Sequence, residues 1–134
     1  MSRRNAREIA FKLVFEYMFS HEQKPELIDE YVADFKGVDK DDDTAFVKEV
    51  YFGVVSKFDE LNSLLAENVQ NFELERLFNA DRAALLLALY EIKFMSDVPY
   101  KVSVDEAIGL VKKYSTEKSS KYVNGVLAKF SGEK

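Results

Sequence analysis

The sequence contains no cysteine and only one histidine, His21. The lack of cysteine excludes disulfides, thiolate catalysis and cysteine-based metal sites. No Ser/His/acid constellation surrounds His21, so we place this histidine in a surface turn. The chain also lacks a Gly-rich phosphate-binding motif. We therefore name no catalytic residue and expect no resident metal or cofactor.

Long hydrophobic runs are also missing. The most apolar stretch, Ala83 to Tyr90, carries no charge, but Asp81 and Arg82 precede it and Glu91 follows it. The run falls far short of the roughly 20 residues that a membrane span needs. Because this run has no polar face, a helix formed from it must be covered on all sides. We therefore predict a central buried helix from about 79 to 96. With no apolar leader at the start, we expect a cytoplasmic protein without membrane contact.

The remaining sequence reads as helices, and at 134 residues we expect a single domain, 1–134. An i, i+3, i+4 apolar rhythm predicts a first helix from Arg3 to Phe19. A second helix should begin at Pro25 and end at Gly37. A third should break near Asp59, and a short connector should span Asn71 to Leu77. The Ser103–Glu106 stretch has the pattern of a capping box, which predicts the start of a helix there.

The acidic run Asp39 to Asp43 has the first part of a calcium-loop spacing. The sixth position is Thr44 rather than glycine, and the twelfth is Val50 rather than glutamate. We therefore do not predict a calcium site. Acids at the head of a helix, with Asp42 or Asp43 as its N-cap, explain the run better.

The net charge of −5 conceals an uneven distribution. Residues 1–12 and 101–134 each carry +3, which leaves −11 for residues 13–100. Basic ends on an acidic body would allow one surface to bind an anion and another to bind a basic protein. A random scatter of surface charge is the alternative.

Three arginines, Arg3, Arg4 and Arg7, cluster at the start of the first helix and lie within about 100° of one another on the helical wheel. Cations at a helix N-terminus oppose the helix dipole, which suggests a role other than helix stability. The planar guanidinium group suits bidentate binding of phosphate. A solvated basic helix end is the alternative interpretation.

Tyr122, in the last predicted helix, is a second candidate for a binding residue. On the wheel of the last helix it lies roughly 90° from the apolar axis, on the side of Lys118 and Gly125. A ring beside lysines, with a glycine that leaves room, suits the stacking of an unpaired base. The alternative is a boundary tyrosine that is half-buried against another helix.

Two segments resemble one family, the transcription antitermination factor NusB: RRNAREIAFKLVF at the start and DVPYKVSVDEAIGLVKKYSTEKSSKYVNGVLAKF at the end. The middle segment FELERLFNADRAALLLALYEI is similar to the stretch that leads into the core helix of that family. The resemblance covers nearly the whole chain. Asn5 departs from the longer arginine run that is common in the family, and Leu86 stands where an arginine is common.

This resemblance implies an all-α fold of about seven helices in two small bundles. It implies an antitermination factor that binds single-stranded boxA RNA of ribosomal RNA operons together with NusE, a small-subunit ribosomal protein. The complex would include RNA polymerase and other Nus factors. The implied RNA-binding residues are Arg3, Arg4, Arg7, Lys118, Lys121 and Tyr122, and the implied NusE-facing residue is Asp81.

One other function stays open at this point, since the chain could be a helical protein–protein adaptor without an RNA role. NusB-like domains also precede some RNA methyltransferase domains, but the lack of a Gly-rich phosphate motif argues against methyl transfer here. The antitermination hypothesis requires the two basic ends to share one surface that holds RNA, with Arg4 and Tyr122 on the same side.

Overall fold

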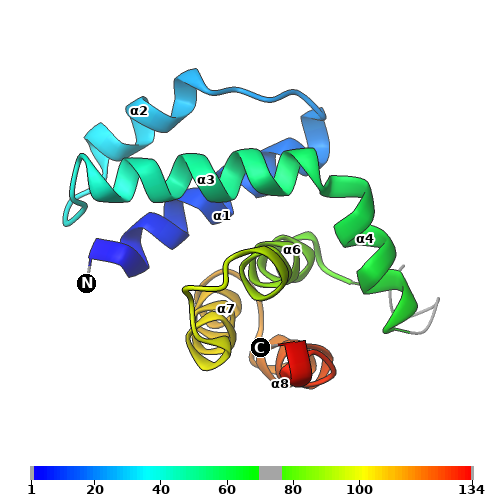
Figure 1. Cartoon of the computed structure of the whole chain (residues 1–134). Helices are drawn as coiled ribbons and strands as arrows, with labels where there is room; N and C mark the ends of the chain where they lie inside the picture. Colours follow the sequence, from blue (N-terminus) through cyan, green and yellow to red (C-terminus); the bar gives the residue numbers. More distant parts are fainter. Residues whose placement is uncertain (1, 70–76, 134) are drawn as a thin grey trace. The chain divides into compact units, whose positions relative to one another are not determined.

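The computed structural model describes residues 2–69 and 77–133, and these residues form α-helices joined by short links (Figure 1). Contacts between residues divide the chain into two compact units, Met1–Ser56 and Lys57–Lys134. Each unit is described by itself. The all-α prediction is confirmed, whereas the prediction of a single domain over 1–134 stays a prediction.

The first unit consists of α1 (Ser2–Ser20), α2 (Glu26–Asp34) and α3 (Asp42–Ser56). Each of these helices contacts the other two, and α3 lies along α1 in Figure 1. The apolar rhythm of the sequence forms the interior, where Ile9, Leu13 and Ile28 are at most 1% exposed. The prediction for the first helix is confirmed, since its bounds differ from the structure by one residue at each end.

The link between α2 and α3 is fastened to the start of α1. The Asn5 side-chain amide donates to the carbonyl oxygens of Lys36 at 3.2 Å and Gly37 at 3.1 Å. Gly37 has a φ of 78°, and a Cβ atom there would lie 2.8 Å from the Asn5 amide nitrogen. The positive φ favours glycine at this position, whereas the close Asn5 nitrogen is the end of a flexible side chain that can shift. The preceding helix ends at Asp34, so the prediction that it extends to Gly37 is wrong.

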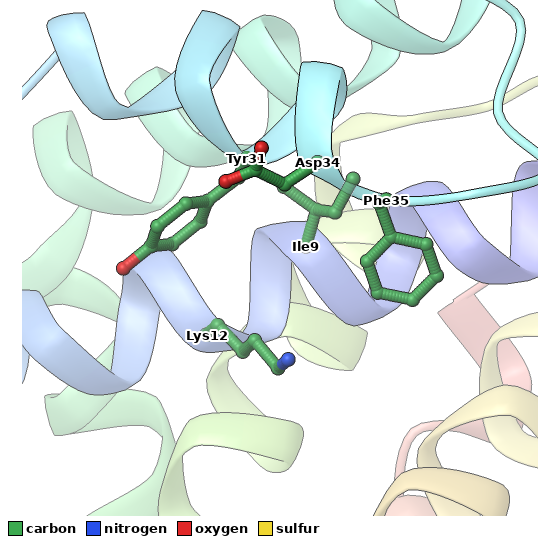
Figure 2. Close-up of a pocket in the computed structure, with 5 residues that line it drawn as sticks. All are labelled: Ile9, Lys12, Tyr31, Asp34 and Phe35. Carbon is green, nitrogen blue, oxygen red and sulfur yellow. The ribbon is translucent and has the colours of Figure 1, made fainter.

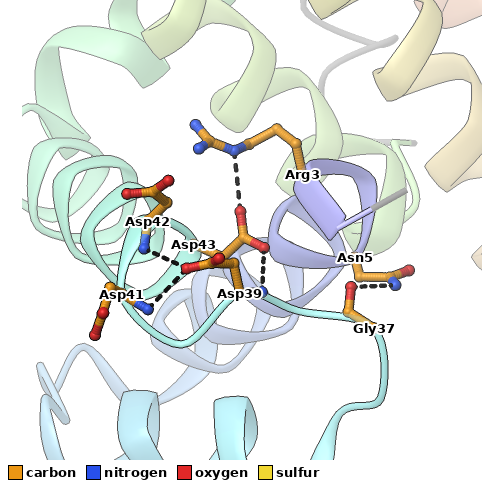
Figure 3. Close-up of polar contacts among 7 residues, drawn as sticks. All are labelled: Arg3, Asn5, Gly37, Asp39, Asp41, Asp42 and Asp43. Carbon is orange, nitrogen blue, oxygen red and sulfur yellow. Dashed lines mark hydrogen bonds and ion pairs between the residues drawn. The ribbon is translucent and has the colours of Figure 1, made fainter.

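Asp39, rather than Asp42 or Asp43, caps α3. Its Oδ1 accepts hydrogen bonds from the backbone amides of Asp41 at 3.0 Å and Asp42 at 2.9 Å (Figure 3). Asp43 lies inside the first turn and is buried. The N-cap prediction is therefore wrong by a few residues, because several adjacent acids fit the sequence rule equally well. Among the described residues no acid, histidine or cysteine cluster could hold a metal ion.

The second unit consists of α4 (Phe58–Glu67), α6 (Asn79–Phe94), α7 (Tyr100–Tyr114) and α8 (Glu117–Ala128), followed by a 3₁₀ turn at Ser131–Glu133. The helix α6 contacts the other three helices of the unit. Every residue from Ala83 to Leu89 is at most 2% exposed. The predicted buried helix is thus confirmed, including Leu86, whose apolar side chain suits complete burial.

Three boundary predictions have different outcomes. The break after the third helix falls at Lys57, two residues before the predicted Asp59. The predicted connector from Asn71 to Leu77 lies, apart from Leu77, outside the described residues. The predicted capping box is wrong: α7 begins at Tyr100 after Pro99, and the Ser103 hydroxyl donates to the Glu91 carboxylate at 3.2 Å instead. Across the described ranges, no helix is both long and apolar enough to cross a membrane.

A partly buried tyrosine hydroxyl joins α1 and α2, and it provides a test of how these two helices pack. The Tyr31 hydroxyl donates to the Glu16 carboxylate, and this hydrogen bond, together with burial and the charge of Glu16, raises the pKa of Tyr31 from 10.0 to about 12. A raised folded-state pKa means that the neutral phenol is stabilised by folding. This stabilisation is complete below about pH 10 and is lost as the pH rises through about 12.

We predict that Tyr31→Phe lowers the free energy of unfolding below about pH 10 and that the deficit shrinks as the pH rises toward about 12. Urea unfolding across this range measures the difference, and Tyr114→Phe, at an exposed tyrosine, is the control. A deficit that is constant with pH would contradict the Glu16 contact.

Candidate nucleic-acid interface

The predicted RNA-binding residues belong to both units. Arg3, Arg4 and Arg7 lie in α1 of the first unit, whereas Lys118, Lys121 and Tyr122 lie in α8 of the second. Each set is described within its own unit. That the two sets share one surface stays a prediction.

Arg3 is held by two contacts with α3. Its Nε donates to Asp43 Oδ1 at 3.1 Å, and its guanidinium carbon lies 4.4 Å from the centroid of the Phe46 ring. The Arg3 side chain is 45% exposed, whereas that of Asp43 is 2% exposed. The cation therefore reaches the surface from a fixed and buried anchor.

Arg4 and Arg7 differ in exposure although they are three residues apart. Arg4 is exposed, but Arg7 is only 5% exposed, and its guanidinium carbon lies 5.1 Å from the same Phe46 ring. One turn of helix separates Arg3 from Arg7, so both cations reach one aromatic ring. Cations over a ring face are attracted by its quadrupole, which gives Arg7 a structural role in this unit. Its predicted RNA contact stays a prediction.

Sequence reasoning did not assign Phe46 and Asp43 to the site. Phe46 fitted the apolar stripe of the third helix, and Asp43 fitted the helix-capping rule. Their spacing of three residues places both side chains on one face of α3. The spacing of Arg3 and Arg7 does the same on α1, but only the packing of α1 against α3 shows that these two faces meet.

The second predicted set lies on the surface of α8. Thr116 caps this helix, since its Oγ1 accepts from the Ser119 amide at 3.2 Å. Lys118 and Lys121 are exposed, and Tyr122 is half-buried. The Tyr122 hydroxyl oxygen is buried, so the exposed part of this residue is not its hydroxyl. A Cβ atom at Gly125 would meet nothing within 4 Å, which agrees with the predicted open space beside the ring.

Asp81, the predicted NusE-facing residue, is 4% exposed. Its Oδ2 accepts from the Ser119 hydroxyl at 2.7 Å, which ties the start of α6 to the first turn of α8. The carboxylate thus holds the helix that carries Lys118, Lys121 and Tyr122. A direct partner contact of Asp81 stays a prediction.

A pocket of about 330 Å³ lies between α1 and α2, and Figure 2 shows its lining. Ile9 and Lys12 line the pocket from α1. Tyr31 and Asp34 line it from α2, and Phe35 lines it from the residue that directly follows α2. The Lys12 ammonium lies 5.6 Å from the centroid of the Phe35 ring, and the Tyr31 hydroxyl is bonded to Glu16. No single helix pattern in the sequence could have indicated this pocket, because both helices form it.

These features define a small all-α protein whose exposed cations lie on helix surfaces, with no metal cluster among the residues described. Comparison with known proteins gives the particular family. The chain belongs to the NusB family, whose profile matches residues 4–132.

Relatives and solved structures agree with this assignment. A transcription antitermination protein NusB from Clostridium botulinum is 38% identical over 139 residues, with 96% of this chain and 99% of the relative covered. The structure of T. maritima NusB has a TM-score of 0.85 at 30% identity and covers 98% of this chain and 91% of that one. A crystal structure of antitermination factors NusB and NusE in complex with dsRNA has a TM-score of 0.84 at 28% identity, covering 97% and 96%.

The Asp81–Ser119 contact gives a prediction about stability. Ser119→Ala removes the hydroxyl that donates to Asp81, whose other oxygen is buried and has no hydrogen-bond partner among the described residues. We expect a loss of about 1–3 kcal/mol in the free energy of unfolding, because a buried carboxylate then lacks a donor. Urea unfolding at neutral pH is the measurement.

Ser120→Ala is the matched control for this change. The Ser120 hydroxyl donates to the Glu117 carbonyl oxygen of its own helix in an exposed hydrogen bond, so the loss of unfolding free energy should stay within about 0.5 kcal/mol. Equal losses for the two variants would show that Ser119 does not carry the contact between α6 and α8.

Proposed function

We propose that this chain is a transcription antitermination factor that binds boxA RNA of ribosomal RNA operons together with NusE. The observation that carries the proposal is its membership of the NusB family over 4–132, together with its likeness to a NusB that was crystallised with NusE and RNA. Within this function the protein binds RNA and NusE, and it catalyses no chemical step. Its partners include RNA polymerase and other Nus factors in an elongation complex.

The exposed cations supply the affinity for RNA. Arg4, the outer part of Arg3, Lys118 and Lys121 are accessible for phosphate contacts. Each neutralised phosphate releases counterions, so binding by these residues should weaken steeply with salt. These contacts position the RNA but carry no direct sequence information.

Tyr122 supplies the sequence-tolerant part of base recognition. Its half-buried position and the open space at Gly125 leave room for an unpaired base beside the ring. Hydrogen bonds to the base edges, which single-stranded RNA exposes, would add sequence preference. The ring at the edge of a lysine-bearing helix surface thus combines stacking with charge.

The acidic body favours a basic protein partner. Residues 13–100 carry −11, which repels RNA phosphates and attracts a cationic protein such as NusE. We therefore infer that RNA binding is weak without NusE and is strengthened by it.

Fluorescence anisotropy with a labelled boxA-like strand tests the function. We expect tighter binding to this strand than to a scrambled strand, an increase in affinity with NusE, and a clear loss between about 50 and 200 mM salt. The same sequence as a duplex is a further arm, because the solved NusB–NusE complex contains dsRNA. The absence of any RNA preference with NusE present would favour the adaptor function. Equal RNA binding with and without NusE would reject only the inferred dependence on the partner.

The stacking role of Tyr122 gives a second prediction. Tyr122→Leu keeps an apolar side chain but removes the aromatic face, and we expect it to weaken boxA binding by about 1–3 kcal/mol. Tyr122→Phe keeps the ring and should bind within a few-fold of the wild type. Circular dichroism and thermal unfolding show whether each variant is folded. If a folded Leu variant binds as tightly as the Phe variant, Tyr122 does not stack on a base.

A further inference from the structure

We propose that Asp43 and Phe46 are positioning residues that orient Arg3 so that its terminal guanidinium nitrogens bind an RNA phosphate. This inference rests on the proposed RNA-binding function and adds two residues of α3 to the RNA site.

The contact between Arg3 and Asp43 uses the inner donor of the guanidinium group. The bond runs from Nε to Asp43 Oδ1, and in Figure 3 the two terminal nitrogens point away from the carboxylate. Arginine has five N–H donors, of which four are on the terminal nitrogens. This contact therefore leaves the outer edge, formed by the two terminal nitrogens, available for bidentate bonds with phosphate.

Asp43 is a fixed anchor, because its own position is determined by α3. Its side chain is 2% exposed, and its Oδ2 accepts from the Asp39 backbone amide at 2.7 Å. It also lies in the first turn of α3, where the helix dipole favours a negative charge. The carboxylate is thus ordered by α3 whether or not the half-exposed Arg3 is present.

Phe46 makes a second contact with the same guanidinium group. The guanidinium carbon of Arg3 lies 4.4 Å from the ring centroid, one helical turn from Asp43. The cation thus lies over the Phe46 ring, and its Nε–H is bonded to Asp43. A long side chain that is already ordered loses less conformational freedom when it binds, so it contributes more to affinity.

An opposite effect of Asp43 is physically conceivable, since a carboxylate beside Arg3 cancels part of its charge and repels phosphate. The geometry favours positioning over cancellation for two reasons. The Asp43 charge is already compensated by the Asp39 amide and the start of α3, and only the inner nitrogen of Arg3 is used. The two effects have opposite signs in a binding measurement.

The experiment measures boxA-strand affinity in the presence of NusE, by anisotropy, for Asp43→Asn, Arg3→Ala and the double variant. We expect Asp43→Asn to weaken binding by about three- to tenfold in the wild-type background and to change it by less than about 1.5-fold in the Arg3→Ala background. Tighter binding by Asp43→Asn, or an equal loss in both backgrounds, would overturn the proposal.

Asp42→Asn is the matched control for charge. Asp42 is exposed and lies next to Asp43, but the ion pair of Arg3 is with Asp43, so neutralising Asp42 should leave RNA binding unchanged or slightly tighter. If both asparagine variants change affinity in the same direction and to the same extent, general charge rather than positioning explains the effect.

Arg3→Lys tests the idea without altering the buried acid. Lysine keeps the charge, but its single ammonium lacks a second donor edge, so pairing with Asp43 leaves no fork for phosphate. We expect this variant to lose most of what Arg3→Ala loses. Wild-type affinity for a folded Arg3→Lys variant would overturn the proposal even if Asp43→Asn fails to fold.

The wild-type measurement separates this inference from the proposed function. If the wild type with NusE shows no RNA preference, the proposed function fails and the inference fails with it. If the wild type binds boxA RNA and the Arg3–Asp43 coupling is absent, only the inference fails. NMR of the RNA-free protein reports the contact directly. We expect the Arg3 Nε proton to exchange slowly with water in the wild type and to exchange faster in Asp43→Asn.

Discussion

The second unit depends on the complete burial of a helix that has no polar face. From Ala83 to Leu89, α6 has no polar side chain that water could solvate. The helices α4, α7 and α8 therefore pack against it. Its two buried carboxylates then determine how the covering helices dock. Asp81 accepts from Ser119 of α8, and Glu91 accepts from Ser103 of α7. Buried acids that are bonded to serines specify position, because each would lose its hydrogen bond if the covering helix shifted.

The first unit uses charge in a different way. Its arginines are not equivalent surface cations, because Arg7 is buried over Phe46, Arg3 is anchored by Asp43, and Arg4 is exposed. A cluster that reads as uniformly basic in sequence therefore divides into a structural cation, an oriented cation and an accessible one. Within the first unit, the buried Arg7 thus packs against α3, whereas Arg4 and part of Arg3 are exposed to solvent.

Sequence reasoning succeeded where a local pattern had one physical solution. The apolar run of α6, the periodic stripe of α1 and the break before α4 were all predicted to within about two residues. It failed where several residues satisfied the same local rule. Asp39 caps α3 although Asp42 or Asp43 was expected to, and Ser103 donates to Glu91 although it was assigned to a capping box. In both cases a side chain had a choice of partners, and tertiary packing selected one.

By itself, the sequence determined the helical class, the buried central helix and the family, because periodicity, composition and motif order are properties of the chain alone. Only the tertiary structure decided what each candidate residue contacts. Asp81 turned inward to Ser119, and Arg3 and Arg7 met Phe46, because these pairs lie about 40 residues apart in sequence and become neighbours only when helices pack. The exposure of a side chain and the residue that it contacts depend on the neighbouring helix, and a local sequence pattern does not specify that helix.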